Sequence, residues 1–520
     1  TTKLGDIINS GPLYVGKPIA GYSNVDHPGY AAFKNNYKDR VPMIYVGAND
    51  GMLHGFNACI PGVTPGCSSV DAGKELLVYV PSTAYENLSR LSDRDYTANH
   101  RYFVDGSPMM GDVYSSATST WRTILVSSLN GGGEGYFALD VTNPADATKS
   151  APTFSAANAA SLLLWEFTSN DDADMGYSHN LPQINPFTSQ AMQIVKMENN
   201  QWAVIVGNGY NSTGGKAVLY ILFISGGEDG SWTIGTDYIK LIADTGTGNG
   251  LSTPTPFDSN GNGKIDVIYA GDLKGNLWKF DVSSSTPASW KVAISGTPLF
   301  SSGTTKPIIS PPSVSFHPKG GQLVLFGTGK YLETADTTTT STQTIYGLWD
   351  NNTTATLAVS SLVQQVMTYA SIRTLTQNAV SYSTTVKGWY INLPVSGERL
   401  TGVPSLEDGI LVFTTIVPSA SPCDFGGRGF VNAVNYLTGG MLPFPAFDTN
   451  RNRVLALDDG LSAGMEIGFS VGGVTRIRGH SNEPHDIFVY STADGSLNQT
   501  TTAKGAAGLR GRITWRELIQ

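Results

Sequence analysis

The sequence of 520 residues contains no uninterrupted run of about 18 apolar residues, the length at which a helix can begin to span a bilayer. Charged residues make up only 14% of the chain, and no cluster of lysine and arginine interrupts its formal net charge of -9. A negative chain without a basic patch does not attract phosphates, which excludes nucleic acid as a partner. We therefore expect no transmembrane segment in this chain.

Motifs of familiar enzymes and zinc sites are also missing. The 7 histidines are scattered, without a His-x-His or His-Glu-x-x-His pattern, and no Gly-x-Ser-x-Gly or P-loop motif occurs. The glycine-rich stretch 131–135 precedes an apolar run, so it predicts a turn rather than a phosphate-binding loop. We expect no enzymatic activity from these residues.

Cysteine is rare, with only 3 residues in the chain. Cys59 and Cys67 flank a short loop rich in glycine and proline, which favours a disulfide and an oxidising compartment. Cys423 is left either free or paired with a cysteine outside this sequence. The start, Thr1-Thr-Lys-Leu, is not a signal peptide, and we expect the chain to be the C-terminal fragment of a longer protein.

Few windows show the 3.6-residue period of an amphipathic helix, whereas the chain holds 59 glycines and 27 prolines. Many short β-branched or aromatic runs end in Gly, Asn or Asp, a composition that is typical of an all-β protein. Pairs of such runs recur as hairpins, most of them around a glycine-rich turn. The copies lie at 43–56, 124–140, 204–221, 267–281, 323–349 and 410–434.

Repeated hairpins at intervals of roughly 60–90 residues are the sequence signature of propeller blades, each of which is a four-stranded sheet. These copies, with a composite blade from the two ends of the chain, predict seven blades in a single domain over residues 1–520, with long decorating loops. A pair of β-sandwiches is the alternative fold.

Side-chain oxygens recur at alternate positions between residues 258 and 266, with glycines between them. This pattern predicts a loop folded around Ca²⁺, which takes six to eight oxygen ligands at roughly 2.3–2.6 Å. Asp258, Asn260, Asn262 and Asp266 would supply side-chain oxygens, and Lys264 would supply its backbone carbonyl. A turn that binds nothing is the alternative. Because only two of these ligands are charged, we expect an affinity of roughly 10⁻⁷ to 10⁻³ M.

A second stretch, from Asp448 to Asp459, carries oxygens at a similar spacing. Arg451 and Arg453 stand where glycine would ease the turn, and they add positive charge. We predict a structural turn there rather than a second cation site.

Several strings together, and in this order, resemble the C-terminal domain of the PilY/PilC family of type IV pilus biogenesis factors and tip adhesins. The first is Val-Pro-Met-Ile-Tyr-Val-Gly-Ala-Asn-Asp-Gly-Met-Leu-His at 41–54, and the others lie at 79–82, 102–108, 121–144, 206–212, 258–281 and 326–331. The resemblance implies a modified β-propeller with a calcium loop of the form Asp-x-Asn-x-Asp-x-x-x-Asp. Asn262 departs from that form, and the lost negative charge should weaken the binding of the cation without abolishing it.

The same resemblance implies a function in pilus extension against retraction, with calcium as the switch, and hence in twitching motility, surface adhesion and virulence. It implies pilus subunits or a host-cell receptor as partners of a monomeric domain. It also implies a place on the cell surface, with the pilus (fimbrium) and the outer membrane, reached through the periplasm.

Two other functions remain open on the residues. A quinoprotein-like dehydrogenase is the first, because Ala-Gly-Asp-x-x-Gly-x-Leu-Trp hairpins such as 270–278 also occur in propellers that hold a quinone beside calcium. The absence of an adjacent cysteine pair and the single-loop origin of the calcium ligands argue against it. A carbohydrate-binding propeller is the second, and would need exposed aromatic side chains such as Trp232, Trp290 and Trp389.

Overall fold

The computed structural model describes residues 4–185, 188, 190–419, 427–452, 454–468, 475–477, 485–491 and 497–503. Their contacts group the chain into two units, which are described separately. The first unit spans Thr1–Ala270 and Trp278–Gly296, and the second spans Gly271–Leu277 and Thr297–Gln520.

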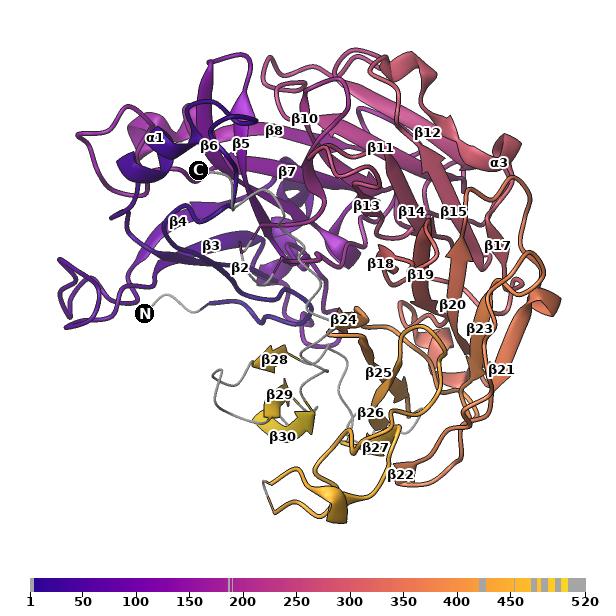
Figure 1. The fold of residues 1–520 in the computed structure, drawn as a ribbon. Helices are drawn as coiled ribbons and strands as arrows, with labels where there is room; N and C mark the ends of the chain where they lie inside the picture. The colour runs from indigo at the N-terminus through magenta and orange to yellow at the C-terminus, as the bar shows by residue number, and fades with distance from the viewer. Residues whose placement is uncertain are drawn as a thin grey trace. The chain divides into compact units, whose positions relative to one another are not determined.

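The first unit begins with two antiparallel sheets, each built from consecutive strands (Figure 1). The order is β1 (Leu13–Val15), β2 (Met43–Ala48), β3 (Met52–Asn57) and β4 (Glu75–Tyr79), then β5 (Met109–Ser115), β6 (Thr120–Ser128), β7 (Gly135–Asp140) and β8 (Leu163–Thr168). The β2–β3 turn contains Gly51 at φ 94°, a left-handed conformation that glycine adopts without steric cost.

Two further sheets follow in the same pattern. The third is β9 (Ile194–Lys196), β10 (Trp202–Gly207), β11 (Ala217–Phe223) and β12 (Tyr238–Asp244). The fourth is β13 (Thr255–Phe257), β14 (Val267–Gly271), β15 (Asn276–Asp281) and β16 (Lys291–Val292), and β17 (Phe300–Ser301) also pairs with β15.

The second unit contains sheets of less regular order. One runs β18 (Ser313–Phe316), β19 (Gln322–Gly327), β20 (Thr344–Asp350), β23 (Gly388–Asn392) and β21 (Leu362–Gln365), with β21 parallel to β23. Another runs β22 (Ile372–Arg373), β27 (Gly464–Glu466), β26 (Arg428–Asn435), β25 (Ile410–Val417) and β24 (Ser405–Glu407). The last is β28 (Thr475–Ile477), β29 (His485–Ser491) and β30 (Leu497–Ala503).

Helices are short. The α-helices are α1 (Tyr30–Asn36), α2 (Ala159–Leu162) and α3 (Ala293–Gly296), and the 3₁₀ turns are η1 (Ser82–Ser92), η2 (Asn130–Gly132), η3 (Ala156–Asn158), η4 (Pro287–Ser289), η5 (Thr334–Thr338), η6 (Val359–Ser361) and η7 (Leu457–Asp459). None of the helices that the structure describes combines the length and the apolar character needed to cross a bilayer.

The central strands of the third sheet, β10 and β11, are buried on both faces. Along β10, Val204 and Val206 join a core cluster with side chains of β5–β8, whereas Ala203 and Ile205 join a second cluster with side chains of β14 and β15. This burial on two sides explains why the strand is apolar throughout instead of alternating with polar residues, since no face of it meets water.

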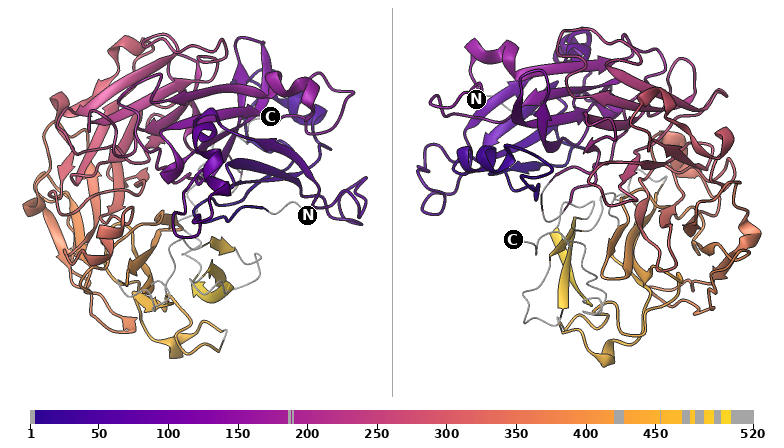
Figure 2. Two further views of the ribbon diagram at one scale, coloured as in Figure 1. Left: turned by 180° about the vertical axis from the view of Figure 1, so that it is seen from behind. Right: turned by 45° about the horizontal axis from the view of Figure 1, so that its top comes forward.

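The all-β prediction is confirmed, and each of the predicted hairpins forms. They are β2–β3, β6–β7, β10–β11, β14–β15, β19–β20 and β25–β26. In the further views of Figure 2, each sheet of the first unit keeps a narrow colour range, because each comes from one stretch of chain. The predicted composite blade would combine strands from both ends of the chain, but the first sheet takes all its strands from residues 13–79. The count of seven blades therefore stays a prediction.

The predicted disulfide is confirmed. Cys59 and Cys67 are bonded, with their Cα atoms 5.8 Å apart, in the loop between β3 and β4. Cys423 lies outside the described residues.

Candidate metal centre

The predicted cation loop joins β13 to β14 in the first unit. Phe257 and Val267 are partners in the antiparallel ladder, so the two ends of the loop are fixed side by side. Gly261 and Gly263 have φ values of 75° and 80°, and a Cβ on either would meet no neighbouring atom. Glycine is therefore favoured at both positions by the left-handed backbone and not by crowding.

The side-chain oxygens of the loop bind its own backbone. Asp258 accepts N–H bonds from residues 261–263, at 2.6 Å, 3.2 Å and 2.7 Å. Asn260 Oδ1 accepts the N–H of Asn262 at 3.0 Å, and Asn262 Oδ1 accepts the N–H of Lys264 at 2.8 Å. Side-chain oxygens at alternate positions in the sequence thus accept backbone N–H groups of the same loop.

Asp266 closes the loop from its C-terminal side. Its side chain is buried, with 6% of the residue exposed. It accepts hydrogen bonds from the N–H and hydroxyl of Ser259, both at 2.9 Å, and from Asn260 Nδ2 at 2.8 Å. Burial raises the pKa of the Asp266 carboxyl, the bonds from Ser259 oppose that shift, and the charges of Asp258 and Glu198 add to it. The loop therefore holds a buried carboxylate with two further acidic side chains nearby.

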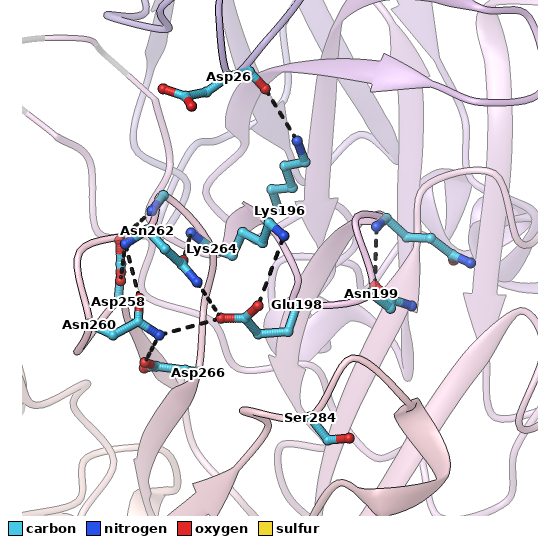
Figure 3. Close-up of polar contacts among 12 residues, drawn as sticks. Asp26, Lys196, Glu198, Asn199, Asp258, Asn260, Asn262, Lys264, Asp266 and Ser284 are labelled. Carbon is cyan, nitrogen blue, oxygen red and sulfur yellow. Dashed lines mark hydrogen bonds and ion pairs between the residues drawn. The ribbon is translucent and has the colours of Figure 1, made fainter.

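Glu198 lies across from the loop, in the turn between β9 and β10 (Figure 3). Its Oε1 accepts Asn262 Nδ2 at 2.7 Å and Asn260 Nδ2 at 3.5 Å, and its Oε2 is 4.0 Å from Lys264 Nζ. Glu198 was not among the site residues predicted from the sequence. It stands 62 residues before Asn260, and no local motif marks it.

Lys196 extends the charged group on the other side. Its ammonium donates to the carbonyl oxygen of Asp26 at 3.5 Å (Figure 3). Burial lowers the pKa of Lys196, the charge of Lys264 lowers it further, and Asp26 opposes the shift. Two lysines thus flank the acidic residues of the site, and Lys264 directs its ammonium to Glu198 rather than to the loop oxygens.

The residues predicted from the sequence come together as one loop. In the described part of the chain, no group of three or more His, Cys, Asp or Glu side chains is gathered closely enough to hold a metal ion. A cation here would therefore rely on amide and backbone oxygens beside the carboxylates of Asp258 and Asp266. An all-oxygen set of mixed charge suits Ca²⁺ and not the nitrogen and sulfur chemistry of Zn²⁺, so the residues fit the predicted ion.

The second loop, between Asp448 and Asp459, repeats part of this geometry in the second unit. Asp459 Oδ1 accepts the N–H of Thr449 at 2.9 Å, and Asn450 Oδ1 accepts the N–H of Asn452 at 3.0 Å. Arg451 takes the left-handed position at φ 61°, and Arg453 lies outside the described residues. The structural turn remains the prediction for this loop.

The tryptophans considered for carbohydrate binding are packed in the protein. Trp389 and Trp290 are 0% and 4% exposed, and both belong to core clusters. Trp232 is partly buried against its neighbours and donates its indole N–H to the carbonyl of Glu166 at 2.7 Å. These side chains offer no open aromatic platform.

Comparison with known proteins identifies the family. The model of the PilY1 β-propeller domain matches residues 4–382. The chain is 35% identical to the type IV pilus biogenesis factor PilY1 of Pseudomonas aeruginosa over 512 residues, which cover 87% of this chain and 40% of that protein. It is 34% identical to a PilY1 homologue of Xylella fastidiosa over 475 residues, which cover 84% of this chain and 29% of that protein.

A solved structure agrees with these matches. The crystal structure of the Pseudomonas aeruginosa PilY1 C-terminal domain aligns with a TM-score of 0.72 and 30% identity, over 95% of this chain and 99% of that chain. The chain spans about 40% of the length of the first curated relatives that it matches. It belongs to the PilY1 β-propeller family, as the repeated hairpins and the cation-loop strings had indicated.

Proposed function

We propose that this domain is a calcium-responsive part of a type IV pilus biogenesis factor, in which occupancy of the loop at 258–266 sets the balance between pilus extension and retraction. The relatives are named as type IV pilus biogenesis factors, which supports a role in building the pilus. The calcium switch, twitching motility and surface attachment go beyond those names and belong to this proposal.

The buried carboxylate of Asp266 is the observation that carries the proposal. Burial raises the pKa of Asp266, and the charges of Asp258 and Glu198 add to that shift, so without a cation the loop brings like charges together. A divalent cation relieves that repulsion and fixes the oxygens around itself, whereas its loss leaves them to repel again. Ion binding therefore stabilises one conformation of this loop on the first unit.

The disulfide supports a proposal for the location of this domain, and the pilus role supports one for its partners. A disulfide between Cys59 and Cys67 suits an oxidising compartment, which supports export through the periplasm to the pilus and the outer surface. Pilus subunits or a host-cell receptor are the partners we propose for a monomeric domain, with adhesion and virulence as consequences.

Calcium titration by calorimetry tests the site. Asp258→Ala and Asp266→Ala should each abolish binding while circular dichroism shows an unchanged fold. Asp229→Ala, an exposed carboxylate that bonds to Ser231 in another loop, serves as the matched control and should bind as the parent does. Undiminished binding by both loop variants would refute the site.

Pilus counts test the switch. In a strain that carries the full-length protein, we expect the loop variants to lose the difference in surface pili between calcium and chelator. Asp266→Lys places a permanent cation in the loop and should give the calcium-bound pilus number without calcium. If Asp266→Lys behaves as Asp266→Ala does, charge neutralisation is not the signal.

The quinoprotein alternative finds no support at this site. The candidate ligands come from one hairpin loop, with Glu198 beside it, and the named relatives are biogenesis factors rather than enzymes. An absorbance spectrum of the purified protein checks this point, because a bound quinone absorbs in the near ultraviolet.

A further inference from the structure

We infer that Glu198 is a positioning residue of the cation loop, which holds Asn262 with its side-chain oxygen toward the loop and makes asparagine the required residue at position 262. The inference rests on the calcium site proposed above. It adds a residue from a different sheet, which the spacing of the loop does not reveal.

The contacts of Glu198 define this role. Its Oε1 accepts the amide nitrogen of Asn262 at 2.7 Å and that of Asn260 at 3.5 Å. The Asn262 amide directs its NH₂ to Glu198, whereas the Asn260 amide donates chiefly to Asp266, at 2.8 Å. Each carbonyl oxygen is therefore turned the other way, where it accepts a backbone N–H of the loop (Figure 3). These are the oxygens that a cation would need.

The fold fixes the carboxylate in place. Met197, next to Glu198, forms a parallel bridge with Ile265, and the N–H of Ile265 donates to the carbonyl of Lys196 at 3.0 Å. Met197 is fully buried in the core between the third and fourth sheets. The Glu198 side chain is itself only 12% exposed. The turn of the third sheet and the loop of the fourth therefore move together.

The negative charge of Glu198 explains why position 262 is an asparagine. An aspartate at position 262 would place a carboxylate oxygen where the amide nitrogen now lies, 2.7 Å from Glu198 Oε1. Two like charges at that distance in a partly buried site repel strongly, whereas an amide donor there makes a charge-assisted hydrogen bond. Glu198 thus adds negative charge near the cation from outside the loop, and it is compatible with Asn262 but not with an ionised aspartate in its place.

Partners that orient metal ligands from outside the first coordination sphere typically change metal affinity by about 10- to 100-fold when removed. We expect a loss of that size for Glu198→Ala. Glu198→Gln keeps the side-chain volume and one acceptor but loses the charge, so it should weaken binding less than Glu198→Ala does.

Calcium titration of a set of variants tests the pairing, with terbium luminescence as the second readout. Asn262→Asp should gain nothing in the Glu198 background, because the new carboxylate faces Glu198. In Glu198→Gln, the same change should strengthen binding by about tenfold, because the glutamine amide donates to the new carboxylate, a coupling well within the range measured for contacting residues. This gain in calcium affinity is not expected if Glu198 only stabilises the turn. Asn200→Gly, at the exposed left-handed position of the same turn, is the matched control and should bind as the parent does.

The outcomes separate the two proposals. If the parent protein binds no calcium, the site itself fails, and with it the inference. If the parent binds and Glu198→Ala binds equally well, or if Asn262→Asp changes the affinity by the same factor in both backgrounds, the site stands and the role of Glu198 is refuted. Circular dichroism of each variant shows that the fold is retained, and Glu198→Gln keeps the test open if Glu198→Ala does not fold.

Discussion

Arg373 and Glu398 form a buried ion pair in the second unit, and its disruption gives a sharp test of how this unit is stabilised. Both side chains are 0% exposed, and the guanidinium binds the carboxylate through two contacts of 2.7 Å and 2.9 Å. Thr415 donates its hydroxyl to the same carboxylate, and Asn432 Oδ1 accepts the guanidinium at 3.1 Å. The guanidinium also lies 3.5 Å from the centroid of the Phe430 ring. The pair and its neighbours connect four parts of the chain, which are β22, β25, β26 and the segment that precedes β24.

The expected loss of unfolding free energy follows from the burial of both charges. Removing one partner of such a pair leaves an uncompensated charge in the core, which costs about 3–5 kcal/mol of unfolding free energy. Arg373→Met and Glu398→Gln should each fall in that range. The double variant removes both charges, so we expect it to cost about 2–3 kcal/mol less than the sum of the two single variants.

Urea unfolding followed by circular dichroism measures these changes as shifts of the midpoint at unchanged slope. The matched control is Glu466→Gln, because Glu466 also binds Arg428 through two contacts, with Nε at 2.7 Å and with Nη2 at 2.8 Å, but the Glu466 and Arg428 side chains are 30% and 40% exposed. Exposed pairs contribute only about 0–1 kcal/mol. If Glu398→Gln costs no more than Glu466→Gln, or if the double variant costs the sum of the singles, the reasoning from burial is wrong.

Three further predictions concern the cation, pH and the disulfide. Calcium at about 100 times its Kd should stabilise the parent protein by about 2.7 kcal/mol, seen as a rise in Tm that chelator reverses and that Asp266→Ala lacks. Burial raises the pKa of Asp105 from 3.8 to about 6, against hydrogen bonds from Asn9, so the folded state binds a proton more tightly than the unfolded state does. Stability should therefore fall as pH rises from about 4 to about 6, by at most about 3 kcal/mol, and urea unfolding of Asp105→Asn should show a flatter dependence. The joint change Cys59→Ser/Cys67→Ser should remove at most about 2.5 kcal/mol, estimated from the short loop that the bond closes, and should speed proteolysis at 58–73 while the circular dichroism spectrum stays unchanged.

The local elements of this protein were predictable because their causes are local. Most of the predicted hairpins combine a turn that tolerates left-handed backbone with apolar strands on either side, and all of the predicted hairpins form. The cation loop is predictable for the same reason, since alternate oxygens between 258 and 266 bind backbone N–H groups only a few residues away.

Strand order in the second unit was not predictable. β21 pairs in parallel with β23, and β22 pairs with β27 from far along the chain, although neither β21 nor β22 is longer than four residues. Such short strands carry little propensity of their own, so their pairing is decided by which apolar faces remain to be covered.

The sequence by itself determined the all-β class, the repeated hairpins, the disulfide and the oxygen-rich loop, because glycine conformation, strand patterning and short-range hydrogen bonds act within a few residues. Only the tertiary structure decided that Glu198 faces Asn262 and that Arg373 meets Glu398. Both pairs join segments that are distant along the chain, and their energies depend on burial and charge separation. Those quantities exist only once the sheets have packed.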